Sequence, residues 1–135
     1  MIRRLDDKTS VSGQLRPEEI AGLAERGVTL VINNRPDGEE PGQPAAADIE
    51  AAVVAAGISY RHVPIFRGIG PADVDAMQDA LHAAGDGRTL AFCRSGNRSA
   101  LAWALAMRKD GASAEEIAQK VTAAGFDVTP IAHLL

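Results

Sequence analysis

The sequence has a single cysteine, few aromatic residues and no long apolar run. Cys93 is the only cysteine among 135 residues, so an internal disulfide is excluded and we expect a reducing, cytoplasmic setting. No apolar stretch is long enough to cross a bilayer, and the first eight residues contain no apolar signal region. The 14 basic residues are outnumbered by 18 acidic ones and are not clustered. This balance argues against nucleic acid or an anionic membrane as a partner.

The length of the chain favours a single domain over residues 1–135. Glycine and proline recur at regular intervals and separate short segments typical of an α/β fold. Proline at helix starts and glycine at helix ends predict helices over 17–26, 44–56, 71–84, 98–110 and 113–124, with a short one after Thr129. Short β-branched runs predict strands over 28–33, 58–65 and 89–92, with an edge strand near 10–14. Strands that alternate with helices predict a mostly parallel sheet of four to five strands with helices on both faces.

The strongest chemical signal surrounds the cysteine. A short apolar strand delivers Cys93 into a tight polar turn, and the turn opens directly into an apolar helix. The backbone N–H groups of residues 94–98 can converge on an anion, Gly96 lets the backbone turn, and the helix start adds a positive dipole. Arg94 and Arg98 add full positive charges. Each effect favours the thiolate, so we expect a nucleophile that acts on an anionic or strongly polarised substrate.

This loop supplies most of the predicted site residues. We predict Cys93 and Arg98 as the catalytic residues. The predicted anion-binding residues are Arg94, Ser95, Gly96, Asn97, Ser99 and Arg35. Ser95 and Asn97 are expected to act through their backbone, and Ser99 either donates to the sulfur or caps the helix.

A second candidate region is the irregular stretch over residues 34–43, which is long for a loop that leaves a buried strand. Arg35 and Asp37 either line the pocket or belong to an ordinary turn. Asp73 lies in the first turn of a predicted helix, where it serves as a catalytic acid or as a partner of the helix dipole. The three histidines stand in different elements without ligand spacing, so we predict no metal and no cofactor.

Three segments together resemble a known family. They are Val31–Glu39 (VINNRPDGE), Tyr60–Ile65 (YRHVPI) and Cys93–Ser99 (CRSGNRS). In this order they are similar to the beta-lactamase-hydrolase-like phosphatase-domain family, a bacterial branch of the tyrosine-phosphatase fold whose members are described as phosphatases or as sulfurtransferases. The last segment also resembles the active loop of single-domain rhodaneses. The resemblance implies a dual-specificity-phosphatase-like fold with Cys93 as its nucleophile.

The chain departs from the phosphatase pattern in three places. Four residues separate Cys93 from Arg98, whereas tyrosine phosphatases have five, and a shorter loop should suit a sulfur atom better than a phosphate. Phe92 replaces the histidine that commonly precedes the phosphatase cysteine. Phe66 and Arg67 stand where dual-specificity phosphatases carry their general-acid aspartate. Losing that acid is costly for an alkoxide leaving group, because general acid catalysis contributes roughly 10²–10⁴-fold.

These departures lead us to expect a rhodanese-like sulfurtransferase that passes sulfane sulfur through a Cys93 persulfide. Its partners would be a small anionic sulfur donor, such as thiosulfate or a low-molecular-weight persulfide, and a thiol acceptor. Relatives fused to a persulfide dioxygenase domain suggest such an enzyme as a further partner. The alternative is a cysteine-dependent phosphatase that works through a Cys93 phosphocysteine. A third reading is a non-catalytic module that senses anions or redox state.

Overall fold

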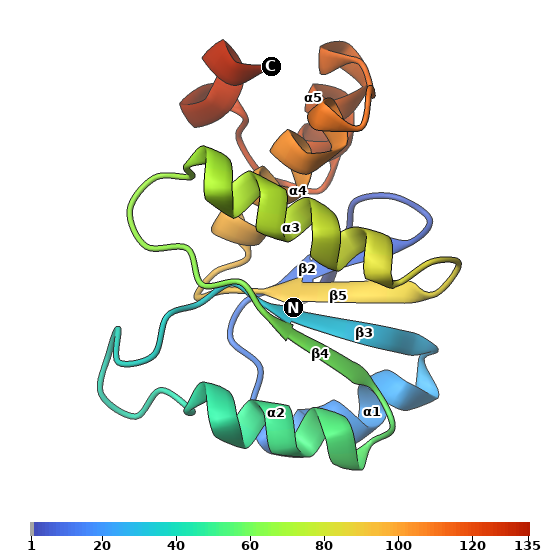
Figure 1. Cartoon of the computed structure of the whole chain (residues 1–135), viewed down its shortest axis with the longest axis vertical. Helices are drawn as coiled ribbons and strands as arrows, with labels where there is room; N and C mark the ends of the chain where they lie inside the picture. The colour runs from blue at the N-terminus through green and yellow to red at the C-terminus, as the bar shows by residue number, and fades with distance from the viewer. Residues whose placement is uncertain (1) are drawn as a thin grey trace.

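A five-stranded sheet lies at the centre of the computed structural model, which describes residues 2–135. The strand order is β1-β2-β5-β3-β4 (Figure 1). The strands are β1 (Ile2–Arg4), β2 (Thr9–Ser12), β3 (Val28–Asn33), β4 (Ser59–His62) and β5 (Arg88–Phe92). Strand β1 pairs antiparallel with β2, and the other pairings are parallel. The predicted α/β fold with a mostly parallel sheet is therefore confirmed.

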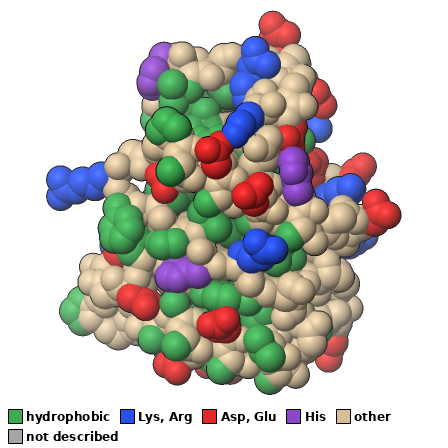
Figure 2. All heavy atoms as spheres, in the orientation of Figure 1, with side chains coloured by type: hydrophobic (Ala, Val, Ile, Leu, Met, Phe, Trp, Pro, Cys, Tyr) green, Lys and Arg blue, Asp and Glu red, His purple; other side chains and the backbone are tan. Residues whose placement is uncertain are grey.

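Helices cover both faces of this sheet. They are α1 (Ile20–Glu25), α2 (Ala46–Ala55), α3 (Pro71–Ala83), α4 (Asn97–Lys109) and α5 (Ala114–Ala123), with 3-10 turns η1 (Pro17–Glu19) and η2 (Thr129–Leu134). Helices α1 and α2 lie on one face, and α3, α4 and α5 lie on the other (Figure 1). Each face has its own apolar cluster, one around Val31 and Phe92 and the other around Ile32 and Trp103. Figure 2 shows acidic and basic side chains interspersed on one face of the molecule.

Helix α4 is the most buried of the helices and carries the cysteine loop at its start. Every residue from 99 to 106 is buried, including Trp103. Four of these eight residues are alanines, and small side chains let a helix approach the sheet and its neighbouring helices closely. The start of α4 is therefore fixed by packing, and so is the turn that joins it to β5.

The elements differ from the sequence prediction mainly at their ends. Strand β1 was missed because all three of its residues are exposed, so no apolar alternation marks it. Strand β4 ends at His62 rather than continuing to residue 65, although the amides of Val63 and Ile65 still donate to the carbonyls of Asn33 and Asn34. Pro64 has no N–H group and cannot donate between them.

The parallel pairing brings three chain segments to one edge of the sheet. Strands β2, β3 and β5 all end there, at Ser12, Asn33 and Phe92. The amide of Asn34 donates to the carbonyl of Phe92 at 2.8 Å, and the amide of Cys93 donates to the carbonyl of Ser12 at 3.3 Å. Residues that follow these strands therefore meet, as expected at the carboxyl edge of an open α/β sheet.

Candidate active site

Cys93 lies at the end of β5, and its side chain is almost completely covered. The residue is 1% exposed. The backbone N–H of Gly96 donates to its sulfur, with 3.1 Å between N and Sγ. Gly96 has a φ of +94°, a left-handed conformation that glycine adopts without steric cost. This turn directs the backbone N–H at the start of α4 back toward the sulfur.

The cysteine loop rests on the segment that follows β2. The amide of Gln14 donates to the carbonyl of Arg94 at 3.2 Å. A Cβ atom at Gly13 would lie only 2.9 Å from that carbonyl oxygen, and one at Gly96 would lie 3.2 Å from the ring of Phe126. Both glycines are therefore required by close packing, and together they fix the path of the loop.

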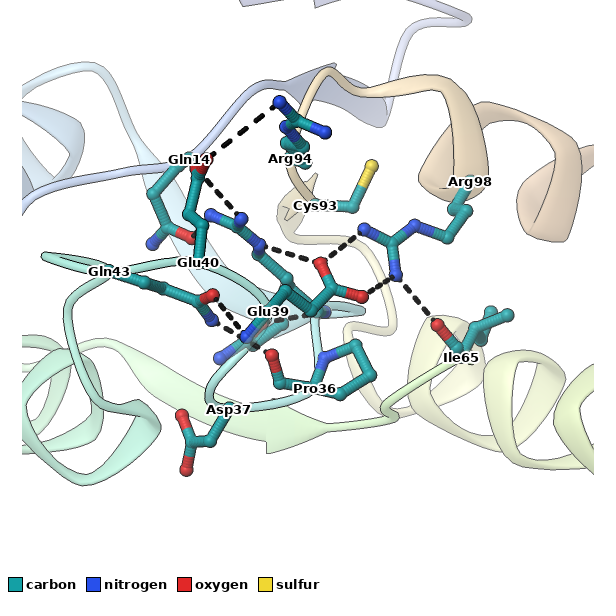
Figure 3. A network of polar contacts seen from close by, with 12 residues as sticks. Gln14, Pro36, Asp37, Glu39, Glu40, Gln43, Ile65, Cys93, Arg94 and Arg98 are labelled. Carbon is teal, nitrogen blue, oxygen red and sulfur yellow. Dashed lines mark hydrogen bonds and ion pairs between the residues drawn. The ribbon is translucent and has the colours of Figure 1, made fainter. Parts of the chain in front are cut away.

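Arg98 extends from the first turn of α4 toward the loop that follows β3. Its Nη1 donates to the carbonyl of Ile65 at 2.8 Å and to Oε2 of Glu39 at 2.7 Å, and its Nη2 donates to Oε1 of Glu39 at 2.7 Å (Figure 3). The paired Glu39 carboxylate, with the nearby Cys93 sulfur, raises the pKa of Arg98 above its ordinary value. The guanidinium thus stays charged beside the cysteine and holds a two-oxygen anion.

Arg35 is a second guanidinium at this site, and it is buried. Its side chain is 1% exposed. Its Nε donates to Oε1 of Glu39 at 2.8 Å, its Nη2 to Oε1 of Glu40 at 2.9 Å and its Nη1 to Oε1 of Gln14 at 3.0 Å. Burial lowers the pKa of Arg35, but the hydrogen bonds to Glu39 and Glu40 outweigh it, so the net shift is upward. Arg35 therefore acts as a fixed charge beneath the loop.

Glu39 joins the two arginines, and the sequence analysis did not single it out. Hydrogen bonds from Arg98 and then from Arg35 lower the pKa of Glu39 to about 2, although burial opposes them. The available signal is its position in the long loop of residues 34–43, a candidate functional region because long loops often carry function. A glutamate in an exposed turn ordinarily faces solvent, so nothing local identified it as the residue that contacts Arg98.

The two aspartates that were considered for the pocket serve helix starts instead. Oδ1 of Asp37 accepts a hydrogen bond from the amide of Ala46, the first residue of α2, at 2.7 Å. Oδ2 of Asp73 accepts from the amide of Gly70, which precedes α3, at 2.9 Å. Both carboxylates therefore satisfy backbone donors that a helix start leaves free.

The remaining predicted anion-binding residues divide into buried and exposed ones. The Ser99 hydroxyl donates to Oδ1 of Asn34 at 2.8 Å, inside the protein. The side chain of Arg94 is 69% exposed and lies 3.8 Å from a carboxylate oxygen of Glu40. The Ser95 hydroxyl accepts from the amide of Asn97 at 3.4 Å. Their roles in binding a substrate anion stay predictions.

Neither a metal centre nor a membrane-spanning helix is found among residues 2–135. No group of three or more His, Cys, Asp or Glu side chains in this range could hold a metal ion. No helix in the same range is long and apolar enough to cross a membrane.

The sequence match decides the family. Residues 1–112 match the family model described as beta-lactamase hydrolase-like protein, phosphatase-like domain. The chain belongs to this family. A beta-lactamase hydrolase-like protein of Xylella fastidiosa is 37% identical over 126 residues, which cover 92% of this chain and 29% of that protein. The chain thus spans less than a third of the length of the curated relatives it matches.

Solved structures place the fold among the phosphatases. A protein of Neisseria meningitidis Z2491, named provisionally as a phosphatase, is 31% identical with a TM-score of 0.83, covering 98% of this chain and 94% of its own. The active form of Tk-PTP is 19% identical with a TM-score of 0.75, covering 98% and 91%, and shows similarity of fold alone. The predicted family and the tyrosine-phosphatase-like fold are confirmed.

The same comparisons favour phosphatase chemistry over sulfur transfer, the two reactions predicted from the sequence. The names of the family, of the relatives and of these neighbours refer to phosphatases or to beta-lactamase hydrolases, and not to sulfurtransferases. The chain is thus a phosphatase-like protein with a single cysteine at the candidate site. This supports the alternative in our sequence analysis better than the sulfurtransferase that we expected.

Proposed function

We propose that this chain is a cysteine-dependent phosphatase. The observation that carries the proposal is the pair of 2.7 Å hydrogen bonds between Arg98 and the two carboxylate oxygens of Glu39. A guanidinium fork that holds two oxygens of a carboxylate can hold two oxygens of a phosphoryl group in the same way. The single outer sulfur atom of a persulfide could accept from only one of these two N–H groups.

The reaction would proceed in two displacements. The Cys93 thiolate attacks phosphorus, the bond from phosphorus to the leaving oxygen breaks, the leaving group departs as an oxyanion that solvent protonates, and a cysteinyl phosphate forms. Water then attacks the phosphorus and loses a proton to solvent, the sulfur–phosphorus bond breaks, and the thiolate is restored with release of phosphate. Arg98 stabilises the negative charge on the phosphoryl oxygens in both steps, while the Gly96 amide stabilises the thiolate before and after.

A second candidate, sulfur transfer, is favoured by the short loop. Four residues separate Cys93 from Arg98, and the Gly96 amide already donates to the sulfur. In this reaction the thiolate attacks the outer sulfur of thiosulfate, the sulfur–sulfur bond breaks, and sulfite leaves. The Cys93 persulfide then gives its outer sulfur to a thiol acceptor, which could be a small thiol or a partner protein.

A side-by-side assay separates these two reactions. Wild type and Cys93→Ser are given 4-nitrophenyl phosphate, thiosulfate with cyanide, and glutathione persulfide. We expect Cys93-dependent release of 4-nitrophenol at a higher rate than transfer from either sulfur donor. Intact mass after rapid quenching should show a phosphate adduct on wild type alone. Faster transfer from thiosulfate or persulfide, with an added sulfur on Cys93, would overturn the phosphatase proposal in favour of the second candidate.

The control for this assay is the fold of the variant. Serine is close to cysteine in size, and the hydroxyl can still accept the hydrogen bond that the Gly96 amide donates to Cys93. Circular dichroism and thermal unfolding should therefore be close to those of wild type. If the variant keeps its fold, a loss of turnover is caused by removal of the thiol.

A further inference from the structure

An apolar groove adjoins Arg98 and continues along helix α4. Its first part is a cavity of about 390 Å³ between the loop that precedes α3, the start of α4 and η2, and Arg98 is one of its lining residues. Its second part is a cavity of about 440 Å³ that reaches Arg108. Ile69 and Leu134 line both cavities, so the two form one continuous groove. Each part has the size of a small-molecule site.

One face of α4 forms the floor of this groove. Its main lining residues are Arg98, Leu101, Leu105 and Arg108. Intervals of three and four residues place side chains on the same side of a helix. At a rise of about 1.5 Å per residue, this stretch of helix is roughly 15 Å long. The carbonyl of Ile65 accepts from the Arg98 guanidinium at one end, so a ligand anchored on this arginine has an apolar surface ahead of it.

The 3-10 turn η2 forms one wall of the groove and is held in place. Ile131 of this turn is buried in the same apolar cluster as Leu101. Nε of Arg108 donates to the carbonyl of Leu135 at 2.9 Å, which fixes the end of the turn against α4. The turn lies outside residues 1–112, which match the family model. The groove is therefore a feature of this chain that the family match does not supply.

The charged side chains at the far end of the groove already have partners. Lys109 forms an ion pair with Asp75, and Arg108 donates to the backbone carbonyls of Leu135 and Ala112. This part of the groove therefore offers a ligand apolar contact. A peptide backbone or a sugar would lose its hydrogen bonds to water there without replacement, which is costly. An aliphatic chain has no polar groups to satisfy, so it fits this lining best.

We propose that the substrate of this site is an amphipathic anion, whose oxyanion binds to Arg98 and whose aliphatic chain lies in the groove. Asn97 and His133 line the cavity beside Arg98, so polar side chains are available at the oxyanion end. The inference rests on the proposed function only in that Arg98 binds the oxyanion. Charge at one end and apolar contact along α4 together select against free phosphate, which has no chain, and against neutral lipids, which have no anion.

Binding of alkylphosphonates tests the groove without any turnover. Methyl-, butyl- and octylphosphonate carry the same oxyanion on a carbon–phosphorus bond that the proposed reaction does not cleave. Full burial of a methylene group corresponds to roughly a fourfold gain in affinity, and we expect about twofold for each one in a groove that is open to solvent. In calorimetric titration, wild type should therefore bind octylphosphonate about 10²-fold more tightly than methylphosphonate.

Leu134 provides the most direct variant, because it lines both cavities and is 51% exposed. Leu134→Ala should bind octylphosphonate about fivefold more weakly than wild type, and methylphosphonate within about twofold of it. Ile69→Ala, at the other shared residue, should show the same pattern. Val54→Ala is the matched control, since Val54 is an exposed apolar residue of α2, across the sheet from the groove (Figure 1). It should bind every phosphonate like wild type.

Arg98→Gln tests whether the oxyanion and the chain bind together. Loss of a charged donor should weaken the binding of every phosphonate by about tenfold or more. The ratio between the affinities for octyl- and methylphosphonate should stay as in wild type. An affinity for octylphosphonate that Arg98→Gln does not change would mean that the chain binds apart from the site, which contradicts the inference.

Four further results overturn the inference. They are equal affinity of wild type for methyl- and octylphosphonate, no binding of either, a gain with chain length that survives both Leu134→Ala and Ile69→Ala, and tighter binding of phenylphosphonate than of octylphosphonate. A dimer in sedimentation that Leu134→Ala dissociates would assign the groove to a second copy of the chain instead. The proposed function fails separately, in the assay with 4-nitrophenyl phosphate. A protein that binds octylphosphonate through the groove but turns over no phosphate retains this inference and loses the phosphatase assignment.

Discussion

Ser99 and Asn34 are joined by a buried hydrogen bond of 2.8 Å between the serine hydroxyl and Oδ1 of the asparagine. The bond links the first turn of α4 to the end of β3, and both residues are completely buried. The amide nitrogen of Asn34 donates in turn to the carbonyl of Val63 at 3.0 Å. The cysteine loop and the loop that carries Glu39 are therefore connected through the interior as well as across the site.

The first prediction concerns this bond. Ser99→Ala leaves Oδ1 of Asn34 buried without its donor, which costs about 1–3 kcal/mol of unfolding free energy. Denaturant unfolding measures this loss. Activity of the folded variant should fall by less than tenfold if the hydroxyl only holds the two loops together. A larger fall with unchanged stability would place the hydroxyl on the sulfur or the substrate instead.

Arg98→Lys tests the guanidinium fork. Lysine keeps the charge but cannot donate to two oxygens and to the Ile65 carbonyl in the same geometry. We expect turnover of 4-nitrophenyl phosphate to fall about 10²–10³-fold, the usual cost of one lost donor to a developing negative charge. Steady-state kinetics measure it. Arg4→Lys, at an exposed position in β1, serves as the control, and an equal loss in both variants would contradict the assigned role of Arg98.

Gly96→Ala tests the path of the cysteine loop. The substitution places a Cβ at a φ of +94° and within 3.2 Å of the Phe126 ring. We expect a loss of about 1–3 kcal/mol in unfolding free energy and a large loss of activity, because the amide that donates to the sulfur moves. Gly22→Ala is the control, since a Cβ there would meet nothing within 4 Å. Full activity of Gly96→Ala would show that this amide is dispensable.

Acid unfolding should report the charge on Glu39. Its pKa is lowered in the folded protein by Arg98 and Arg35, so its contribution to stability is present above the unfolded value near 4.5 and is lost as the pH falls toward 2. Relative to wild type, Glu39→Gln should lose about 1 kcal/mol at pH 7, a small value because solvent screens a partly exposed pair. Denaturant unfolding between pH 7 and 3 should show this difference shrinking as the pH falls.

The exposed glutamate Glu50 of α2 provides the control for that series. Glu50→Gln should follow the wild-type dependence of stability on pH. A constant difference between wild type and Glu39→Gln at every pH would mean that the ion pair does not contribute through the charge of Glu39.

The buried strands β3 and β5 could be predicted from the sequence, and the exposed edge strand β1 could not. Strand β3 and the run into Cys93 are apolar because they lie between two helical layers, and that pattern is visible locally. Strand β1 is a polar edge strand and shows no such pattern. Cys93, Gly96 and Arg98 are close in sequence, so their common loop could be recognised.

Glu39 could not be recognised in this way, because 59 residues separate it from Arg98. Its pairing depends on the parallel order of β3 and β5, which brings the ends of the two strands together only after folding. Asp37, two residues earlier, looked equally suitable by type, yet it faces the start of α2. Sequence position alone does not distinguish two acids of one loop that point to opposite sides.

Strand β2 and the two residues after it support the cysteine loop, and a shortened form of the protein would lose that support. Its last carbonyl, at Ser12, accepts the amide of Cys93, and Gly13 packs against the backbone of Arg94. A version that starts after Gln14 would retain every residue of the cysteine loop and of the helix behind it. It would nevertheless lack the residues on which the cysteine loop rests, so the first 14 residues include structural supports of the candidate site.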